Sequence, residues 1–271
     1  MRHAKNGGGR VRLACLVTAS ALALALASCG SGSGSEASQS ASATGTKSVT
    51  LNVYGAASLT EAFGEIEKIY EEANPGVDVV YNFAGSQDLV DQISAGAPAD
   101  VLATADTTTM DAASSQNLVG EAERFTSNTL VLIVPAGNPA GVTGLDSSLD
   151  GAKLVICARE VPCGAATSKL TGLLDVSLSP VSQEQKVTDV RGKVASGEAD
   201  AGIVYRTDAL AAGNDVETIE IPRAGEVVNE YPAAVVSSSE NRDEAERFVD
   251  LLGSPQGQAI LEKHGFNVAE K

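Results

Sequence analysis

Residues 50 to 83 read TLNVYGAASLTEAFGEIEKIYEEANPGVDVVYNF, and this stretch decides the fold. The apolar run at residues 50–54 predicts a strand. From residue 59 to 73 apolar side chains recur at helical spacing, which predicts an amphipathic helix that the Asn-Pro-Gly sequence at residues 74–76 ends. Residues 77–83 predict a second strand. This order predicts two parallel strands joined by a right-handed helical crossover.

The same alternation continues along the rest of the chain. We expect strands at residues 101–104, 130–134, 154–157, 201–205, 218–221 and 231–236, and helices at residues 88–94, 107–113, 165–174, 187–196, 242–252 and 255–264. These two α/β series suggest two lobes, with candidate crossings between them near Thr129 and Glu230. We therefore expect lobe 1 to comprise residues 48–129 and 231–271, and lobe 2 residues 130–230. A cleft between such lobes is a natural ligand site.

The first 47 residues differ in character from the rest. Four Lys and Arg residues come first, and the apolar run at residues 13–27 has the length of a signal-peptide core. Ala27 and Ser28 then precede Cys29 in an order that resembles a bacterial lipoprotein signal. The resemblance implies a signal peptide at residues 1–28 and a lipid on Cys29; an ordinary secretory signal is the alternative. Residues 29–47 hold almost only small residues and predict a flexible tether.

The expected mature chain is strongly acidic. Residues 1–28 contain four of the 19 basic residues and none of the 35 acidic ones, so the remaining 243 residues carry 15 basic residues and a formal charge of −20. This excess repels nucleic acid and anionic lipid, so we expect no nucleic-acid partner and a membrane contact through the lipid anchor only. Aromatic residues make up 4% of the chain, with no Trp, which favours an aliphatic α/β core over an aromatic-rich β-sandwich.

Two cysteines, Cys157 and Cys163, remain, because Cys15 leaves with the expected signal peptide and Cys29 would carry the lipid. In an oxidising compartment a local disulfide is expected between them, and closing so short a loop stabilises a fold by about 2 kcal/mol. Two free buried thiols and a metal pair are the alternatives. A metal site would need further His or Cys ligands, and His264 is the only histidine after residue 28.

Three predicted strands end in a small polar turn that opens a helix, at residues 55–58, 84–86 and 161–164. Each turn leaves free backbone N–H groups at a helix N-terminus, where the helix dipole favours negative charge. Ser58 and Ser86 add hydroxyl groups. Either serine alone is readily explained as a helix N-cap. Several such turns in one chain favour an anion site.

Seven segments, taken in order, resemble the molybdate-binding proteins of ABC transporters, which are extracytoplasmic solute-binding lipoproteins. The segments are TLNVYGAASL (50–59), NFAGS (82–86), ISAGAPADV (93–101), EVPCGAA (160–166), TDVRGKVASGEADAGIVYRTDA (188–209), EYPAAVV (230–236) and SPQGQAILEKHGF (254–266). The resemblance implies a type II periplasmic-binding-protein fold, each lobe a mostly parallel sheet flanked by helices, with two crossing strands as hinge. It also implies a monomer, lipid-anchored on the outer face of the cell membrane, that needs no cofactor and delivers molybdate or tungstate to a permease and its ATPase subunit.

By the same resemblance, five residues hold the oxyanion through neutral donors. Ser58 and Ser86 would give hydroxyl and backbone N–H groups, Cys163 and Val190 a backbone N–H, and Tyr205 its phenol O–H. Cys163 stands where the family has alanine, which leaves its N–H in place. Molybdenum would occur only inside the bound oxyanion. Neutral dipoles suit a buried dianion in an acidic protein, because they need no compensating cation.

Other functions are disfavoured by what the sequence lacks. A Ser-His-Asp hydrolase would have to use His264, and neither a P-loop nor a G-x-G-x-x-G motif is present. Protonated phosphate needs a carboxylate acceptor that the expected site does not offer. Ferric iron needs tyrosine clusters and carboxylates, and only Tyr205 lies in a motif. Sulfate remains an alternative ligand, because only the size of the cavity would exclude it.

Overall fold

The computed structural model describes residues 48–268, which belong to one compact unit; the expected signal peptide, tether and lipidated Cys29 lie outside the described residues. The strands are β1 (Val49–Ala56), β2 (Val77–Ala84), β3 (Val101–Ala103), β4 (Val119–Asn128), β5 (Leu130–Pro135), β6 (Leu154–Cys157), β7 (Ser182–Glu184), β8 (Ala201–Tyr205), β9 (Val216–Ile219), β10 (Asn229–Val236) and β11 (Asn267–Val268). The α-helices are α1 (Thr60–Ala73), α2 (Ser86–Ser94), α3 (Thr107–Ser115), α4 (Pro162–Leu174), α5 (Val187–Ala195), α6 (Arg206–Ala212), α7 (Arg242–Gly253) and α8 (Pro255–Lys263). A 3₁₀ turn, η1 (Ala57–Leu59), joins β1 to α1.

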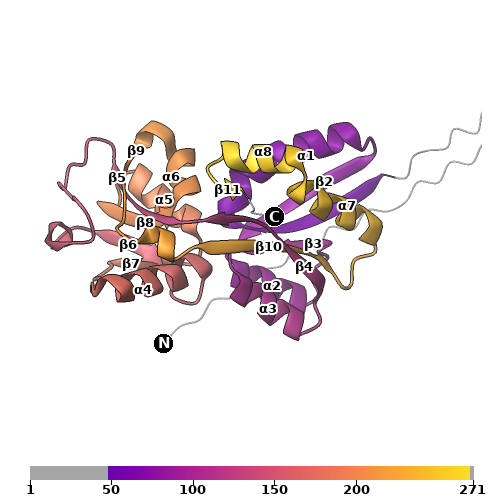
Figure 1. Ribbon diagram of the computed structural model, residues 1–271, viewed down its shortest axis with the longest axis horizontal. Coiled ribbons are helices and arrows are strands. Elements are labelled where there is room, and N and C mark those ends of the chain that lie inside the picture. The colour runs from indigo at the N-terminus through magenta and orange to yellow at the C-terminus, as the bar shows by residue number, and fades with distance from the viewer. Residues whose placement is uncertain (1–47, 269–271) are drawn as a thin grey trace, which may run out of the picture. The chain divides into compact units, whose positions relative to one another are not determined.

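The strands form two sheets, each flanked by helices (Figure 1). The first sheet has the order β11-β4-β10-β3-β1-β2 and the second β7-β6-β8-β5-β9. We call the parts of the chain built on them lobe 1 and lobe 2. The expected α/β fold in two lobes is confirmed.

Each sheet is mixed, whereas the sequence predicts mostly parallel pairing. β1 pairs in parallel with β2 and β3, and β6 with β7 and β8, as strand-helix-strand series require. The antiparallel pairs involve β4, β5 and β10. The chain leaves lobe 1 along β4 and re-enters it along β10, so these neighbouring strands run in opposite directions (Figure 1).

Each lobe has its own packing feature in the core. In lobe 1 aromatic rings gather around Phe63, whose centroid lies 5.8 Å from that of Tyr81 and 5.9 Å from that of Phe248. In lobe 2 the helix α5 packs closely on β8 at Gly202, where a Cβ would meet the side chains of Val190 and Val194 at 2.8 Å. The glycine therefore fixes how near α5 lies to the sheet. No helix within residues 48–268 is long and apolar enough to cross a membrane.

A disulfide joins Cys157, at the end of β6, to Cys163, with their Cα atoms 5.7 Å apart. The helix α4 begins at Pro162, three residues before the expected start, because proline suits the first position of a helix. Cys163 is therefore the second residue of α4, and the disulfide ties the first turn of this helix to the neighbouring strand. The alternatives of two free thiols and a metal pair do not hold in this structure.

Candidate functional site

A small cavity lies between lobe 1 and lobe 2. Its lining comes from residues 56–58, 84–86 and Ala105 of lobe 1, and from residues 161–163, 185–187 and Tyr205 of lobe 2. The volume of this cavity is about 20 Å³. Such a space suits a compact ion of a few atoms.

Ser86 is the first residue of α2, and its hydroxyl oxygen accepts the backbone N–H of Ala105 at 3.1 Å. A hydroxyl that already accepts a hydrogen bond keeps its own proton for another acceptor. The side chain is 1% exposed, so that acceptor is not bulk water. Ser86 is thus arranged as a donor inside the cavity.

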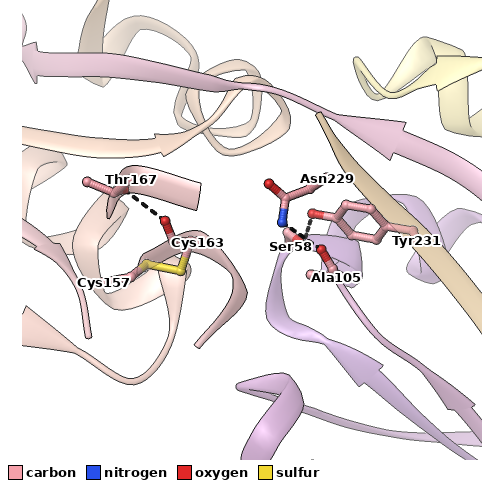
Figure 2. Close-up of a disulfide and its surroundings, with 7 residues drawn as sticks. All are labelled: Ser58, Ala105, Cys157, Cys163, Thr167, Asn229 and Tyr231. Atoms are coloured by element: carbon pink, nitrogen blue, oxygen red, sulfur yellow. Dashed lines mark hydrogen bonds between the residues drawn. A yellow bond between two sulfur atoms is a disulfide. The ribbon is translucent and has the colours of Figure 1, made fainter. Parts of the chain in front are cut away.

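Ser58 lies in η1, directly after β1, and its hydroxyl oxygen is 2.8 Å from the phenol oxygen of Tyr231 on β10 (Figure 2). Both side chains are buried. Burial is the largest cause that raises the pKa of Tyr231, which therefore keeps its proton at neutral pH. When the phenol donates to Ser58, the Ser58 hydroxyl has its own proton left for a ligand.

Tyr205 ends β8, and its phenol oxygen is buried with no hydrogen-bond partner among the described residues. Burial raises the pKa of Tyr205 well above its usual value, and the nearby Tyr231, Asp106 and Asp208 add to this. The phenol is therefore a neutral O–H donor. A buried hydroxyl without a partner costs free energy, so this group favours a ligand that accepts its hydrogen bond.

Cys163 offers a backbone N–H at the start of α4. Pro162 has no N–H, and the N–H groups of Gly164 and Ala165 both donate to the carbonyl of Val161 at 3.0 and 2.9 Å. The Cys163 N–H is thus the donor of this first turn that remains for a ligand. Figure 2 shows Cys163 on one side of the view and Ser58 with Tyr231 on the other.

Val190 differs from the other four expected residues, because it does not line the cavity. It is the fourth residue of α5, is fully buried, and lies against β8 at Gly202. Val187, the first residue of α5, lines the cavity in its place. The helix is the expected one, and the lining residue comes one turn earlier.

Three helices begin at the cavity, because the first residues of α2, α4 and α5 all line it. Their dipoles add partial positive charge without any ionised group. No Asp or Glu lines the cavity, and Lys186 is the only cationic residue of the described lining. Within residues 48–268, no group of three or more His, Cys, Asp or Glu side chains is placed to hold a metal ion. The arrangement is suited to a compact anion.

Several residues that the sequence does not predict also shape this site. Tyr231 supports Ser58, Ala105 supports Ser86, and residues 185–187 close the cavity from lobe 2. Tyr231 lies inside the EYPAAVV segment, so that motif was a signal for it. Ala105 and residues 185–187 lie in no such motif. They contribute mainly through the position of their backbone, which the type of side chain does not reveal.

The chain is similar to known solute-binding proteins over most of its length. The model of a family described as bacterial extracellular solute-binding protein matches residues 51–267. The molybdate-binding protein ModA of Mycobacterium tuberculosis (strain ATCC 25618 / H37Rv) is 41% identical over 216 residues, which cover 79% of this chain and 83% of that protein. The molybdate-binding protein ModA of Escherichia coli (strain K12) is 34% identical over 232 residues, which cover 80% and 89%.

Solved structures share the fold. The periplasmic molybdate-binding protein of Azotobacter vinelandii aligns with a TM-score of 0.71 at 21% identity, over 81% of this chain and 100% of that one. The sulfate-binding protein SubI of Mycobacterium tuberculosis H37Rv aligns with a TM-score of 0.67 at 19% identity, over 82% and 88%. At these identities the likeness concerns the fold and leaves the ligand open.

Proposed function

We propose that this chain, which belongs to the bacterial extracellular solute-binding protein family, captures molybdate between its two lobes for an ABC importer. Relatives of at least 30% identity that carry the name molybdate-binding protein support this ligand. The family is one of binding proteins, so the protein acts by holding and releasing a ligand and catalyses no reaction.

One observation carries the proposal: hydroxyl donors from both lobes and three helix N-termini meet at one small cavity that no carboxylate among the described residues lines. We assign the ligand contacts to Ser58, Ser86, Cys163 and Tyr205. The N–H of Val190 stays a prediction as the fifth donor, with Val187 as the alternative from the same helix. A dianion buried among these groups gains charge-assisted hydrogen bonds, which are stronger than neutral ones.

The same donors disfavour two other ligand classes. A protonated phosphate needs an acceptor for its proton, and within residues 48–268 no Asp or Glu lines the cavity. Ferric iron is favoured by phenolates, whereas burial raises the pKa of both Tyr205 and Tyr231 and keeps them protonated. Tungstate satisfies the same donors as molybdate and is proposed as a second ligand. Sulfate is the alternative that the donor set alone does not reject.

The proposed route of delivery depends on closure and anchoring. The chain crosses between the lobes after Asn128 and before Asn229, which face each other at the end of the β4–β10 ladder. We propose that the lobes close on the anion by bending there, and that the closed form docks on a permease served by an ATPase subunit. The lipid on Cys29 and the tether at residues 29–47 would hold the protein at the outer face of the cell membrane.

Calorimetric titration of the protein with molybdate tests the proposal. Ser86→Ala and Tyr205→Phe should each weaken binding by about 1.5–3 kcal/mol, which is roughly ten-fold or more in affinity. Ser115→Ala, on the exposed side of α3, is the matched control and should leave affinity unchanged. Competition with tungstate, sulfate and phosphate ranks the anions. Sulfate binding more tightly than molybdate, or no binding of either oxyanion, would refute the assigned ligand.

A further inference from the structure

The backbone of Gly85 lies very close to lobe 2 at the cavity. A Cβ placed on Gly85, in lobe 1, would lie 2.4 Å from the backbone carbonyl oxygen of Gln185 and 3.5 Å from the side chain of Val161, both in lobe 2. Ordinary contact of a Cβ begins at 3.4 Å. The obstacle is a backbone atom, so no side-chain rotation can relieve it.

The backbone conformation of Gly85 does not itself require glycine. Its φ of −60° and ψ of 141° are open to any residue, and it serves as the N-cap position of α2. Its carbonyl accepts the N–H of Leu89 at 3.1 Å, a bond that a Cβ does not disturb. Alanine would therefore fit lobe 1 taken alone. The conflict arises only with lobe 2.

We propose that Gly85 sets how far the lobes close and so determines the affinity of the site without touching the ligand through a side chain. This inference rests on the proposed function. With any Cβ at this position, lobe 2 has to retreat by about 1 Å at Gln185 to restore ordinary contact. The neighbouring residue Ser86 donates from lobe 1, while Cys163 and Tyr205 donate from lobe 2.

A retreat of this size matters because hydrogen bonds have little tolerance in length. Donor–acceptor distances near 2.9 Å would lengthen toward 3.9 Å for one set of donors, beyond the range of a hydrogen bond. An anion would then be held by lobe 1 or lobe 2, and not by both. The same retreat would also move α5 away from α1, where Arg191 and Glu61 now lie 3.6 Å apart.

The test compares Gly85→Ala with Gly64→Ala. Gly64 lies in α1 of the same lobe and has open space where a Cβ would be, so it is a matched control. We expect Gly85→Ala to weaken molybdate binding at least ten-fold in calorimetry and Gly64→Ala to leave it unchanged. Thermal unfolding without ligand should show that lobe 1 of the Gly85→Ala variant remains folded. Equal affinity in the two variants would overturn the inference.

A crystal structure of the Gly85→Ala variant separates this inference from the proposed function. We expect the Gln185 carbonyl to be displaced from lobe 1 by about 1 Å as part of a movement of the whole of lobe 2. A local tilt of that carbonyl, with the lobes unmoved, would overturn the inference. If the unaltered protein binds no molybdate, the proposed function fails, and the crystal structure still decides whether Gly85 limits closure.

Discussion

The hydroxyl of Ser58 and the phenol of Tyr231 lie 2.8 Å apart, and this buried contact joins the turn after β1 to the strand by which the chain re-enters lobe 1. Tyr231 also packs against Tyr205, with ring centroids 6.0 Å apart at an angle of 69°. One aromatic residue therefore contacts donors from both lobes. Tyr231 positions the site although it does not line the cavity.

Tyr231→Phe should weaken molybdate binding by about 1 kcal/mol, or roughly five-fold, because the Ser58 hydroxyl loses the partner that orients it. The packing of the ring is retained. Calorimetry measures the change, and Tyr81→Phe is the control, since Tyr81 donates to the Phe63 carbonyl at 2.9 Å inside lobe 1. We expect that control to keep full affinity. An unchanged affinity for Tyr231→Phe would show that Ser58 orients itself without the phenol.

Removing the disulfide should affect both stability and binding. Replacing Cys157 and Cys163 by serine opens a loop closed over a sequence separation of 6, which lowers the free energy of unfolding by about 2 kcal/mol. Denaturant titration measures this loss. Molybdate affinity should fall as well, because the first turn of α4 is then free to move and its Cys163 N–H is less well placed. A stability loss with fully retained affinity would contradict a role for the disulfide in the site.

Much of the fold could be predicted from sequence because its apolar patterns are strong. The first helix was predicted at residues 59–73 and lies at Thr60–Ala73. The strand β4 was missed, because five successive residues of VGEAERFTSN are polar or small and exposed. Its place in the sheet comes from pairing with β10, a contact about a hundred residues away in sequence that no local pattern reveals.

The site was predicted in part for a similar reason. Ser58, Ser86, Cys163 and Tyr205 belong to motifs, and the structure brings them to one cavity. Val190 also belongs to a motif, yet which turn of α5 reaches the cavity depends on how closely that helix packs on Gly202. The approach of Gln185 to Gly85 is likewise a property of two lobes in contact. Such relationships appear only when the chain is folded.

The ion pair between Arg191 of α5 and Glu61 of α1 should contribute weakly to closure. The two groups lie 3.6 Å apart, and the Glu61 side chain is half exposed, so the pair gives at most about 1 kcal/mol. Arg191→Gln should lower molybdate affinity by less than about ten-fold at low ionic strength, and the ratio to the unaltered protein should approach one in high salt. Glu61→Gln should lower the affinity by a similar factor, and the double variant should lose no more affinity than either single variant. Additive losses would show that the two residues act independently.

Asp208 should make stability depend on pH. It is buried in the first turn of α6, with one carboxylate oxygen lacking a partner among the described residues. Burial raises its pKa from 3.8 to about 7, and this outweighs the nearby positive charge of Arg191 and the hydrogen bond from the Tyr205 backbone, both of which lower the pKa. The folded protein therefore favours the neutral acid.

The sign of the effect follows from proton binding. Between pH 4 and pH 7 the folded state holds a proton on Asp208 that the unfolded chain has lost, so this residue contributes stability that falls as pH rises through that window. Asp208→Asn removes this pH-dependent contribution to stability, because an amide does not titrate, and it keeps an acceptor for the Tyr205 N–H. The free energy of unfolding of the variant minus that of the unaltered protein should increase from pH 4 to about pH 7 and stay constant above pH 7. Denaturant titrations at several pH values measure this difference. Asp111→Asn, at an exposed position of α3, is the control for the loss of a charge. A constant difference across this range would show that the folded protein holds Asp208 ionised throughout.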